Sequence, residues 1–207
     1  EPALSSVRAQ TLRDLEIIVV DDGSTDGTPN VIRRHAEADR RIVTMRQENK
    51  GVIASLNRLL GVAKGKYLAR MDADDVCRPD RLERQIGFLE ANPSVAAVGG
   101  AIEFIDHLGD VLGRSQVRQT PGEIRETLEQ CNCIVHPTAV IRRAAMRKVG
   151  GYRSAYRHAE DYDLWLRISE VADLANLPDV VLQHRQHAGR VSLKHAEQQV
   201  LSARGAA

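Results

Sequence analysis

Residues 16–28 read EIIVVDDGSTDGT, an apolar run that ends in carboxylates and a glycine-containing turn. Residues 66–75 repeat the arrangement as KYLARMDADD, with carboxylates again after the apolar run. β-Branched runs with little alternation are typical of strands buried on both faces of a parallel sheet. Ligands bind outside the carboxyl ends of strands in open α/β sheets, so we expect both clusters to face one polar, metal-capable crevice. Adjacent carboxylates repel one another unless a cation or hydrogen-bond donors satisfy them, which favours a functional role.

The first hundred residues alternate between strand-like and helix-like patterns. A helix ends within residues 4–12, and the strands predicted after it are 15–20, 42–45 and 67–71. The predicted helices begin at Thr28-Pro29, cover 52–63 with a glycine cap at Gly65, and begin again at Pro79. This alternation predicts an α/β fold with a doubly wound, mostly parallel sheet and helices on both faces.

The second half of the chain has a different pattern. Its predicted strands are 95–98, 101–105, 111–117 and 179–184, with a turn over 106–110. Thr120-Pro-Gly-Glu123 fits a capping box that opens a short helix, and a further helix is predicted over 161–171. We find no internal repeat and no linker. Residues 1–207 are therefore expected to form a single α/β domain with a mixed C-terminal half.

The composition excludes several classes of protein. A chain of 207 residues, 43% of them hydrophobic, can bury a core, and no apolar run is long enough to span a bilayer. The 29 basic and 28 acidic residues leave a net charge of +1, which gives no general attraction to nucleic acid or acidic lipid. Cys77, Cys131 and Cys133 lack zinc-site spacing, and with no signal peptide in view we expect reduced thiols in a cytoplasmic protein.

Asp21-Asp22-Gly23-Ser24 lies at a predicted strand-to-helix turn and has two interpretations. One is a capping turn, in which the Asp and Ser side chains accept hydrogen bonds from free helix N–H groups and the glycine takes a positive φ. The other is a ligand site, in which one carboxylate accepts hydrogen bonds from a nucleobase or a ribose.

Asp72-Ala73-Asp74-Asp75 is a sharper signal. In an extended segment Asp72 and Asp74 point to the same side, where they can hold a hard divalent cation and leave positions for phosphate oxygens. An EF-hand calcium loop fits poorly, because the downstream glycine and the twelfth-position Glu are missing. The alternative is a solvated acidic turn, although a buried strand rarely ends in three carboxylates by chance.

Glu160 and Asp161 begin a third acidic segment, EDYDLWLR, at the start of a predicted helix. Acidic residues there can complement the helix dipole, or one carboxylate can act as a general base that contributes about 10²–10⁴-fold in rate. We interpret Trp165 as a core residue rather than a sugar platform. His184 and His187 are candidate metal ligands, against the alternative that they are simply exposed.

The order of these motifs resembles that of the family 2 glycosyltransferases, which have the GT-A fold. The matching segments are residues 16–28, Asn49-Lys-Gly51…Asn57, residues 64–75 followed by Arg78-Pro-Asp-Arg81, His136-Pro-Thr…Ile141-Arg142…Gly150-Gly151-Tyr152, residues 160–165, and Arg185-Gln-His187…Ser192. The resemblance covers nearly the whole chain, and its specificity lies in the succession of motifs rather than in any one of them.

The resemblance implies a transfer from a nucleotide sugar. By analogy Asp22 contacts the base, and Asp72 lies near the ribose and the sugar. Arg70 or Arg81 contacts phosphate or has a structural role. The residues implied in nucleotide binding are Asp21, Asp22, Asn49, Gly51, Arg70 and Asp72.

The same analogy implies a metal ion and a base. Asp74 binds Mg²⁺ or Mn²⁺ that bridges the diphosphate, with Asp72 and His187 as further candidate ligands. The cation neutralises the diphosphate leaving group. Asp161 deprotonates the acceptor hydroxyl from the opposite face, which makes the transfer inverting, and Glu160 is the second catalytic candidate.

The implied biology follows from this chemistry. Residues 1–100 form the half that binds the nucleotide-sugar donor, and residues 101–207 form the half that binds the acceptor and carries the base. The expected acceptor is a hydroxyl of a glycan or lipid-linked molecule in bacterial cell-envelope polysaccharide biosynthesis. We expect no nucleic-acid partner, a cytoplasmic location that extends to the inner face of the membrane, and a possible homodimer.

Two departures from the family pattern qualify these expectations. Family members usually begin with an apolar strand that ends near a Tyr-Asn pair and lines the nucleotide pocket, whereas this chain begins inside the following helix. We therefore expect a missing central strand, exposed edges on its neighbours and weaker nucleotide binding. A Gln-x-x-Arg-Trp motif is absent, so a processive synthase is not expected. The alternatives are a catalytically inactive nucleotide- or sugar-binding module and a nucleotidyltransferase, which would release pyrophosphate.

Overall fold

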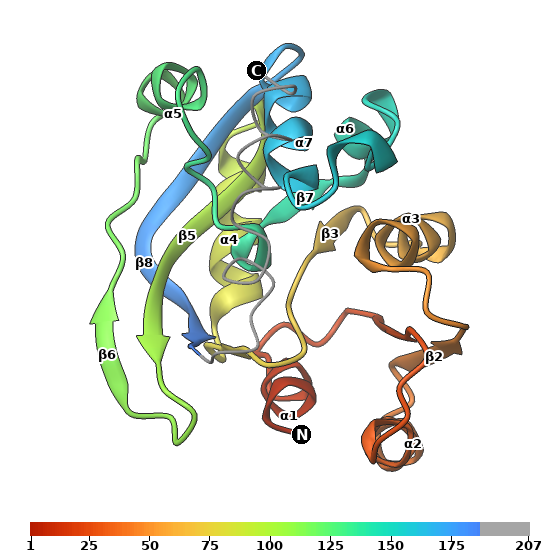
Figure 1. Ribbon diagram of the computed structural model, residues 1–207. Coiled ribbons are helices and arrows are strands. Elements are labelled where there is room, and N and C mark those ends of the chain that lie inside the picture. Colours follow the sequence, from red (N-terminus) through yellow and green to blue (C-terminus); the bar gives the residue numbers. More distant parts are fainter. Residues whose placement is uncertain (187–207) are drawn as a thin grey trace.

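The structure, a computed structural model, describes residues 1–186, which form two sheets (Figure 1). In the first sheet β1 (Ile17–Asp21) pairs in parallel with β2 (Ile42–Arg46). The helices α2 (Thr28–Ala38) and α3 (Val52–Val62) lie below and above this pair in Figure 1. Pro29 occupies the first turn of α2, as predicted, because its fixed φ suits that position and its missing N–H is not needed there.

The second sheet has six strands and forms the centre of the molecule. Its order is β3 (Tyr67–Ala69), β7 (Val140–Arg142), β5 (Val95–Ile105), β8 (Asp173–Arg185) and β4 (Val76–Cys77), and β6 (Val111–Arg114) also pairs with β5. The strands β5 and β8 run in parallel along their whole length, with Val95 opposite Asp173 and Ile105 opposite Arg185. The other pairings in the described part of this sheet are antiparallel.

Helices cover both faces of the second sheet. Successive residues of β5 enter two different apolar clusters, since Ala97 packs into one and Val98 into the other. The first cluster includes α5 (Pro121–Leu128) and α7 (Glu160–Ser169), and the second includes α4 (Arg81–Ala91). The remaining helical segments are α1 (Pro2–Arg8), α6 (Arg143–Lys148) and the 3₁₀ turns His136–Thr138 and Ser154–Tyr156. No helix within residues 1–186 is both long and apolar enough to cross a membrane.

Strand direction differs from the expectation of a mostly parallel sheet. The pairs β1–β2 and β5–β8 are parallel, whereas β3, β4, β6 and β7 run antiparallel to their neighbours. One reason lies in the connections, because the tight turn over residues 106–110 between β5 and β6 can join only antiparallel strands. The α/β class, the helices on both faces and the mixed C-terminal half are confirmed, and the second sheet as a whole is mixed rather than mostly parallel.

Two glycines that suggested a break between strands lie inside a single strand. The strand β5 runs without interruption through Gly99 and Gly100, although a register shift marks the pairing there. A Cβ atom on Gly99 would lie 2.2 Å from Asn176 Oδ1, and one on Gly100 would lie 2.8 Å from a Val181 methyl. These glycines therefore permit the close approach of β8. The strand β8 itself starts at Asp173, earlier than the predicted residue 179.

Local predictions at helix ends had different outcomes. The capping box is confirmed, since Thr120 accepts a hydrogen bond from Glu123 N and the Glu123 side chain accepts one from Thr120 N. The predicted glycine cap at Gly65 is wrong, because α3 ends at Val62 and Ala63 follows it as the C-cap. The segments β4, β7 and α6 were not predicted, because each is too short to show a period in the sequence.

A matched pair of glycine substitutions tests the close approach of β5 and β8. We expect Gly99→Ala to lower the free energy of unfolding by about 1–3 kcal/mol, because the added methyl group overpacks the contact with Asn176. Gly87 is exposed on α4 with open space at its Cβ, so Gly87→Ala should raise stability by about 0.5–1 kcal/mol. Urea denaturation monitored by circular dichroism measures both, and equal stability of the two variants would contradict the packing argument.

Candidate active site

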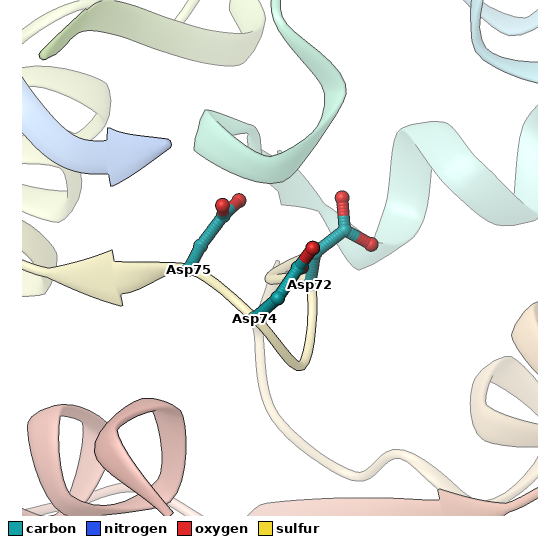
Figure 2. Close-up of side chains that lie close together, drawn as sticks. All are labelled: Asp72, Asp74 and Asp75. Atoms are coloured by element: carbon teal, nitrogen blue, oxygen red, sulfur yellow. The ribbon is translucent and has the colours of Figure 1, made fainter. Parts of the chain in front are cut away.

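Three carboxylates gather in the loop between β3 and β4, which we call the acidic loop (residues 70–75). The strand β3 ends at Ala69, and the chain turns before β4 begins at Val76. Oxygens of Asp72, Asp74 and Asp75 all lie within 4.8 Å of one another. Figure 2 shows their carboxylates on the same side of the loop. Three oxygen donors at this spacing suit a hard divalent cation.

Asp75 is the buried member of the cluster. Its Oδ1 accepts a hydrogen bond from Arg185 N at 3.0 Å, whereas its buried Oδ2 has no hydrogen-bond partner among the described residues. Burial, followed by repulsion from Asp72 and Asp74, raises the pKa of Asp75 to about 7. A buried carboxylate oxygen left without a donor is costly, so the acidic loop fits a cation by its chemistry as well as by its spacing.

Arg70 neutralises Asp72. Its two terminal nitrogens contact the two carboxylate oxygens at 2.6 and 2.5 Å, a bidentate pair. A cation bound by Asp72 would have to share or replace this arginine, whereas within residues 1–186 no arginine side chain pairs with Asp75, whose Oδ1 lies 3.5 Å from His184 Nδ1. Asp74 is the exposed member of the cluster. The arrangement therefore gives Asp74 and Asp75 the better geometry for a cation and gives Asp72 a strong internal partner.

Arg81 has a different environment from Arg70. It is 2% exposed and donates hydrogen bonds to the carbonyl of Arg70 and to Gln85 Oε1. Burial lowers its pKa to about 10. Of the two arginines considered as phosphate ligands, Arg81 therefore has the environment of a structural residue. Its hydrogen bond to the carbonyl of Arg70 restrains the first residue of the acidic loop.

Asp161 lies in the first turn of α7, where its carboxylate is half-buried. It accepts hydrogen bonds from Asn132 Nδ2 at 2.8 Å and from Tyr162 N at 2.9 Å. Burial and the neighbouring Glu160 raise the pKa of Asp161 to about 6, and the two hydrogen bonds and the charge of Arg70 oppose that rise. Arg70 thus acts on both Asp72 and Asp161 and links the acidic loop electrostatically to α7.

Glu160 is more deeply buried than Asp161. Its side chain is 9% exposed, and its Oε2 has no hydrogen-bond partner within residues 1–186. Its position beside Asp161 contributes to the raised pKa of that residue. Glu160 therefore acts on the candidate base through its charge, and its own catalytic role stays a prediction.

His136, Tyr152 and Trp165 form a buried aromatic group. His136 Nε2 is 2.8 Å from the Tyr152 hydroxyl, and the Trp165 ring packs edge-on against His136. Burial lowers the pKa of His136 well below its ordinary value, so the ring is neutral. Trp165 is fully buried, which confirms its interpretation as a core residue.

Asp22 organises the loop between β2 and α3. Its Oδ1 accepts from Gln47 Nε2 at 2.7 Å and Lys50 N at 2.9 Å, and its Oδ2 accepts from Gly51 N at 2.9 Å. Burial alone would raise the pKa of Asp22, but these hydrogen bonds outweigh it and the pKa is lowered. Gly51 has a φ of +84°, a conformation that favours glycine. Asn49 lies exposed in the same loop.

Asp21 faces a turn rather than a helix end. Its Oδ1 accepts from Ser24 N at 2.8 Å, its Oδ2 lies 3.4 Å from Arg46 Nε, and the hydrogen bonding with Ser24 lowers its pKa. The helix α2 begins only at Thr28, with Gly27 as its N-cap and no side-chain cap. The expectation that Asp21 and Ser24 cap the helix is therefore wrong, because the turn closes before the helix begins, whereas the expected positive φ of the glycine is confirmed at Gly23, with a φ of +83°.

The contacts place the predicted residues in two groups. Asp21, Asp22, Asn49 and Gly51 lie around the ends of β1 and β2, and Arg70 pairs with Asp72 of the acidic loop while its charge lowers the pKa of Asp161. His187 lies outside the described residues. Asn132 was not predicted, and Asp75, His136 and Tyr152 stood in matching motifs without an assigned role. Asp75 stood inside a quoted motif, and only its burial, which depends on β8, distinguishes it from an ordinary surface carboxylate.

The chain is similar to known glycosyltransferases over most of its length. The family model described as glycosyl transferase family 2 matches residues 1–150. An uncharacterized glycosyltransferase of Haemophilus influenzae is 33% identical over 96% of this chain and 65% of its own length. The putative glycosyltransferase EpsE of Bacillus subtilis is 37% identical over 81% of this chain and 61% of its own length. The amylovoran biosynthesis glycosyltransferase AmsE of Erwinia amylovora is 33% identical over 93% of this chain and 72% of its own length. The chain thus spans less than two thirds of the length of the first two relatives.

Solved structures agree with this assignment. The mannosyltransferase PcManGT from Pyrobaculum calidifontis, determined with GDP-Man and Mn²⁺, superposes with a TM-score of 0.68 at 25% identity, over 94% of this chain and 54% of that one. TarS of S. aureus, determined with UDP, gives a TM-score of 0.71 at 21% identity, over 89% of this chain and 56% of that one, which shows a shared fold.

Substitution of Asp22 tests its role in the loop between β2 and α3. We expect Asp22→Ala to lower the free energy of unfolding by about 2–3 kcal/mol, because three hydrogen bonds to a charged group are lost. Asp26→Ala is the control, since Asp26 is exposed and its carboxylate accepts a hydrogen bond from the nearby Thr28 N, in the same turn. Urea denaturation gives the stabilities. Unchanged hydrogen-exchange protection at Lys50 and Gly51 in Asp22→Ala would contradict the assigned contacts.

Proposed function

Because the chain belongs to glycosyl transferase family 2, we propose that it transfers a sugar from a nucleoside-diphosphate donor to a hydroxyl of a glycan or lipid-linked acceptor. The observation that carries this proposal is the close grouping of Asp72, Asp74 and Asp75 at the end of β3. Transfer from such a donor needs charge neutralisation at the diphosphate and a base at the acceptor. The acidic loop and Asp161 supply candidates for the two tasks.

In this proposal the acidic loop holds Mg²⁺ or Mn²⁺. Asp74 and Asp75 are the principal ligands, and Asp72 and His187 stay predicted as further ones. When bound, the cation neutralises the negative charge that develops on the diphosphate as the anomeric bond breaks. The Mn²⁺ and GDP-Man of the related mannosyltransferase support this assignment. Arg70, which is paired with Asp72, is placed to contribute positive charge at the same end of the donor.

Asp161 is the proposed general base. Its hydrogen bonds from Asn132 and Tyr162 N fix the carboxylate at the start of α7. A pKa of about 6 makes Asp161 a stronger base than an ordinary aspartate while leaving it largely ionised at neutral pH. A base on a different segment from the donor site suits attack from the opposite face of the sugar, which is the basis for proposing inversion.

The remaining assignments belong to the same proposal. Asp22 and the loop that it organises, with Asp21, Asn49 and Gly51, form the proposed base and ribose end of the donor site. Residues 1–100 then serve the donor, and residues 101–207 serve the acceptor. The name of the relative AmsE supports a place in cell-envelope polysaccharide biosynthesis. Action at the inner face of the membrane and homodimer formation are further parts of the proposal.

Metal-dependent turnover tests the proposed function directly. We expect release of a nucleoside diphosphate from a matching nucleotide sugar only with Mn²⁺ or Mg²⁺, and a loss of at least about 100-fold in Asp74→Ala, because a ligand of the cation is removed. Asp80→Ala is the control, since Asp80 lies outside the acidic loop and pairs with Arg78 and Arg84. Metal-dependent nucleotide binding without turnover would instead indicate an inactive module. Release of pyrophosphate would indicate a nucleotidyltransferase.

The raised pKa of Asp161 predicts the pH dependence of turnover. The base works only when ionised, so kcat should fall about tenfold per pH unit below pH 6 and reach a plateau above it. Asp161→Asn should lower kcat by about 10²–10⁴-fold at pH 7.5 and leave donor binding unchanged. Initial rates across pH 5–8 measure the acid limb. A limb near pH 4, or full activity in Asp161→Asn, would exclude Asp161 as the base.

A further inference from the structure

Arg185, the last residue of β8, contacts two separate segments of the chain, the acidic loop and the turn between β5 and β6. Its Nε donates to the carbonyl of Asp74 at 3.1 Å. Its Nη1 donates to the carbonyls of Asp106 and His107, in the turn between β5 and β6, at 2.7 and 3.2 Å. Its backbone N donates to Asp75 Oδ1 at 3.0 Å. Arg185 therefore binds the acidic loop at two points, the backbone carbonyl of Asp74 and the carboxylate of Asp75.

The groups that Arg185 holds are those that define the cation site. The carbonyl of Asp74 belongs to the peptide that joins Asp74 to Asp75, so the hydrogen bond from Arg185 Nε restrains the orientation of that peptide plane and hence the directions in which the two side chains leave the backbone. The hydrogen bond to Asp75 Oδ1 orients that carboxylate, whose Oδ2 is buried without a hydrogen-bond partner among residues 1–186. Partners behind the ligands set the geometry of metal sites in this way.

Besides Arg185, the strand β8 contacts the acidic loop through His184, whose Nδ1 lies 3.5 Å from Asp75 Oδ1. The strand β4, which follows the loop, has only two residues, and they pair with Gln183 and Leu182 of β8. On the opposite side Arg81 holds the carbonyl of Arg70. A two-residue strand gives limited support to a loop that carries mutually repelling carboxylates, so the side chain of Arg185 is a substantial part of the restraint.

Building on the proposed function, we propose that Arg185 is a positioning residue for the divalent cation, which sets the geometry of Asp74 and Asp75 and ties it to the turn at Asp106 and His107. Its planar guanidinium suits this task. Nε and Nη1 point in fixed, different directions and reach both loops simultaneously, which a lysine ammonium cannot reproduce. The turn belongs to the half proposed to bind the acceptor, so Arg185 couples that half to the cation site.

The test compares Mn²⁺ binding by the full chain in four forms. Calorimetric titration with Mn²⁺ alone should show that Arg185→Met binds about 10–100-fold more weakly than wild type, as is typical for loss of a residue behind the ligands. The Mn²⁺ affinity of Arg185→Lys should lie between those of Arg185→Met and wild type, because the lysine can keep one of the two loop contacts. Arg114→Met is the matched control, since Arg114 lies in the β5–β6 hairpin whose turn Arg185 contacts, and it pairs with Glu103 rather than with a residue of the acidic loop.

A measurement without metal separates positioning from general loss of stability. In the metal-free proteins, backbone amides of residues 72–76 should exchange hydrogen faster in Arg185→Met than in Arg114→Met, at a temperature where both are folded. Wild-type affinity for Mn²⁺ in Arg185→Met, with unchanged exchange in this loop, would overturn the inference and leave the proposed function intact. Failure of the wild-type chain to bind Mn²⁺ would overturn both the cation site and this role. Arg185→Lys decides the case if Arg185→Met does not fold.

Discussion

The parallel pairing of β5 with β8 is the contact around which the described part of the molecule is arranged. Eleven-residue β5 and thirteen-residue β8 pair from Val95 opposite Asp173 to Ile105 opposite Arg185, with register shifts along the way. Both faces of the pair are covered, and glycines at positions 99 and 100 leave room for the side chains of β8. The pairing also ends at Arg185, so the same contact that forms the core delivers the backbone N–H that Asp75 accepts.

Electrostatic cost is concentrated where the chemistry is proposed. The folded pKa values of Asp75 and Asp161, about 7 and about 6, lie above the unfolded value of about 3.9. The folded state therefore favours the protonated forms, and each group lowers stability progressively as pH rises from near 4 through its folded pKa. Bidentate pairing with Arg70 limits this cost at Asp72. A divalent cation would remove much of it at Asp75, which is how a site can be destabilising alone and favourable when filled.

The sequence predicted much of the fold and of the acidic loop. Strong apolar runs located β1, β2 and most of β5, and the turn chemistry at Thr120 located the start of α5, because these signals are local. Strand direction was predicted poorly, since the pattern of apolar residues in a strand does not indicate whether it pairs in parallel or antiparallel. The short segments β4 and β7 are too short to show a hydrophobic period. The glycines in β5 suggested a break in the strand, because the side chains that require them, Asn176 and Val181, lie on the neighbouring strand β8.

Residue chemistry along the chain was enough to assign the family, to find three acidic segments and to predict a divalent cation at Asp72 and Asp74. Folding determined which of those carboxylates is exposed, paired or buried. Arg70 pairs with Asp72, and β8 packs against the buried Asp75. Burial and the charge of Glu160 raise the pKa of Asp161. Each of these outcomes depends on groups brought together from distant parts of the chain. A pKa or an unsatisfied oxygen is set by three-dimensional neighbours, and no spacing in the sequence specifies them.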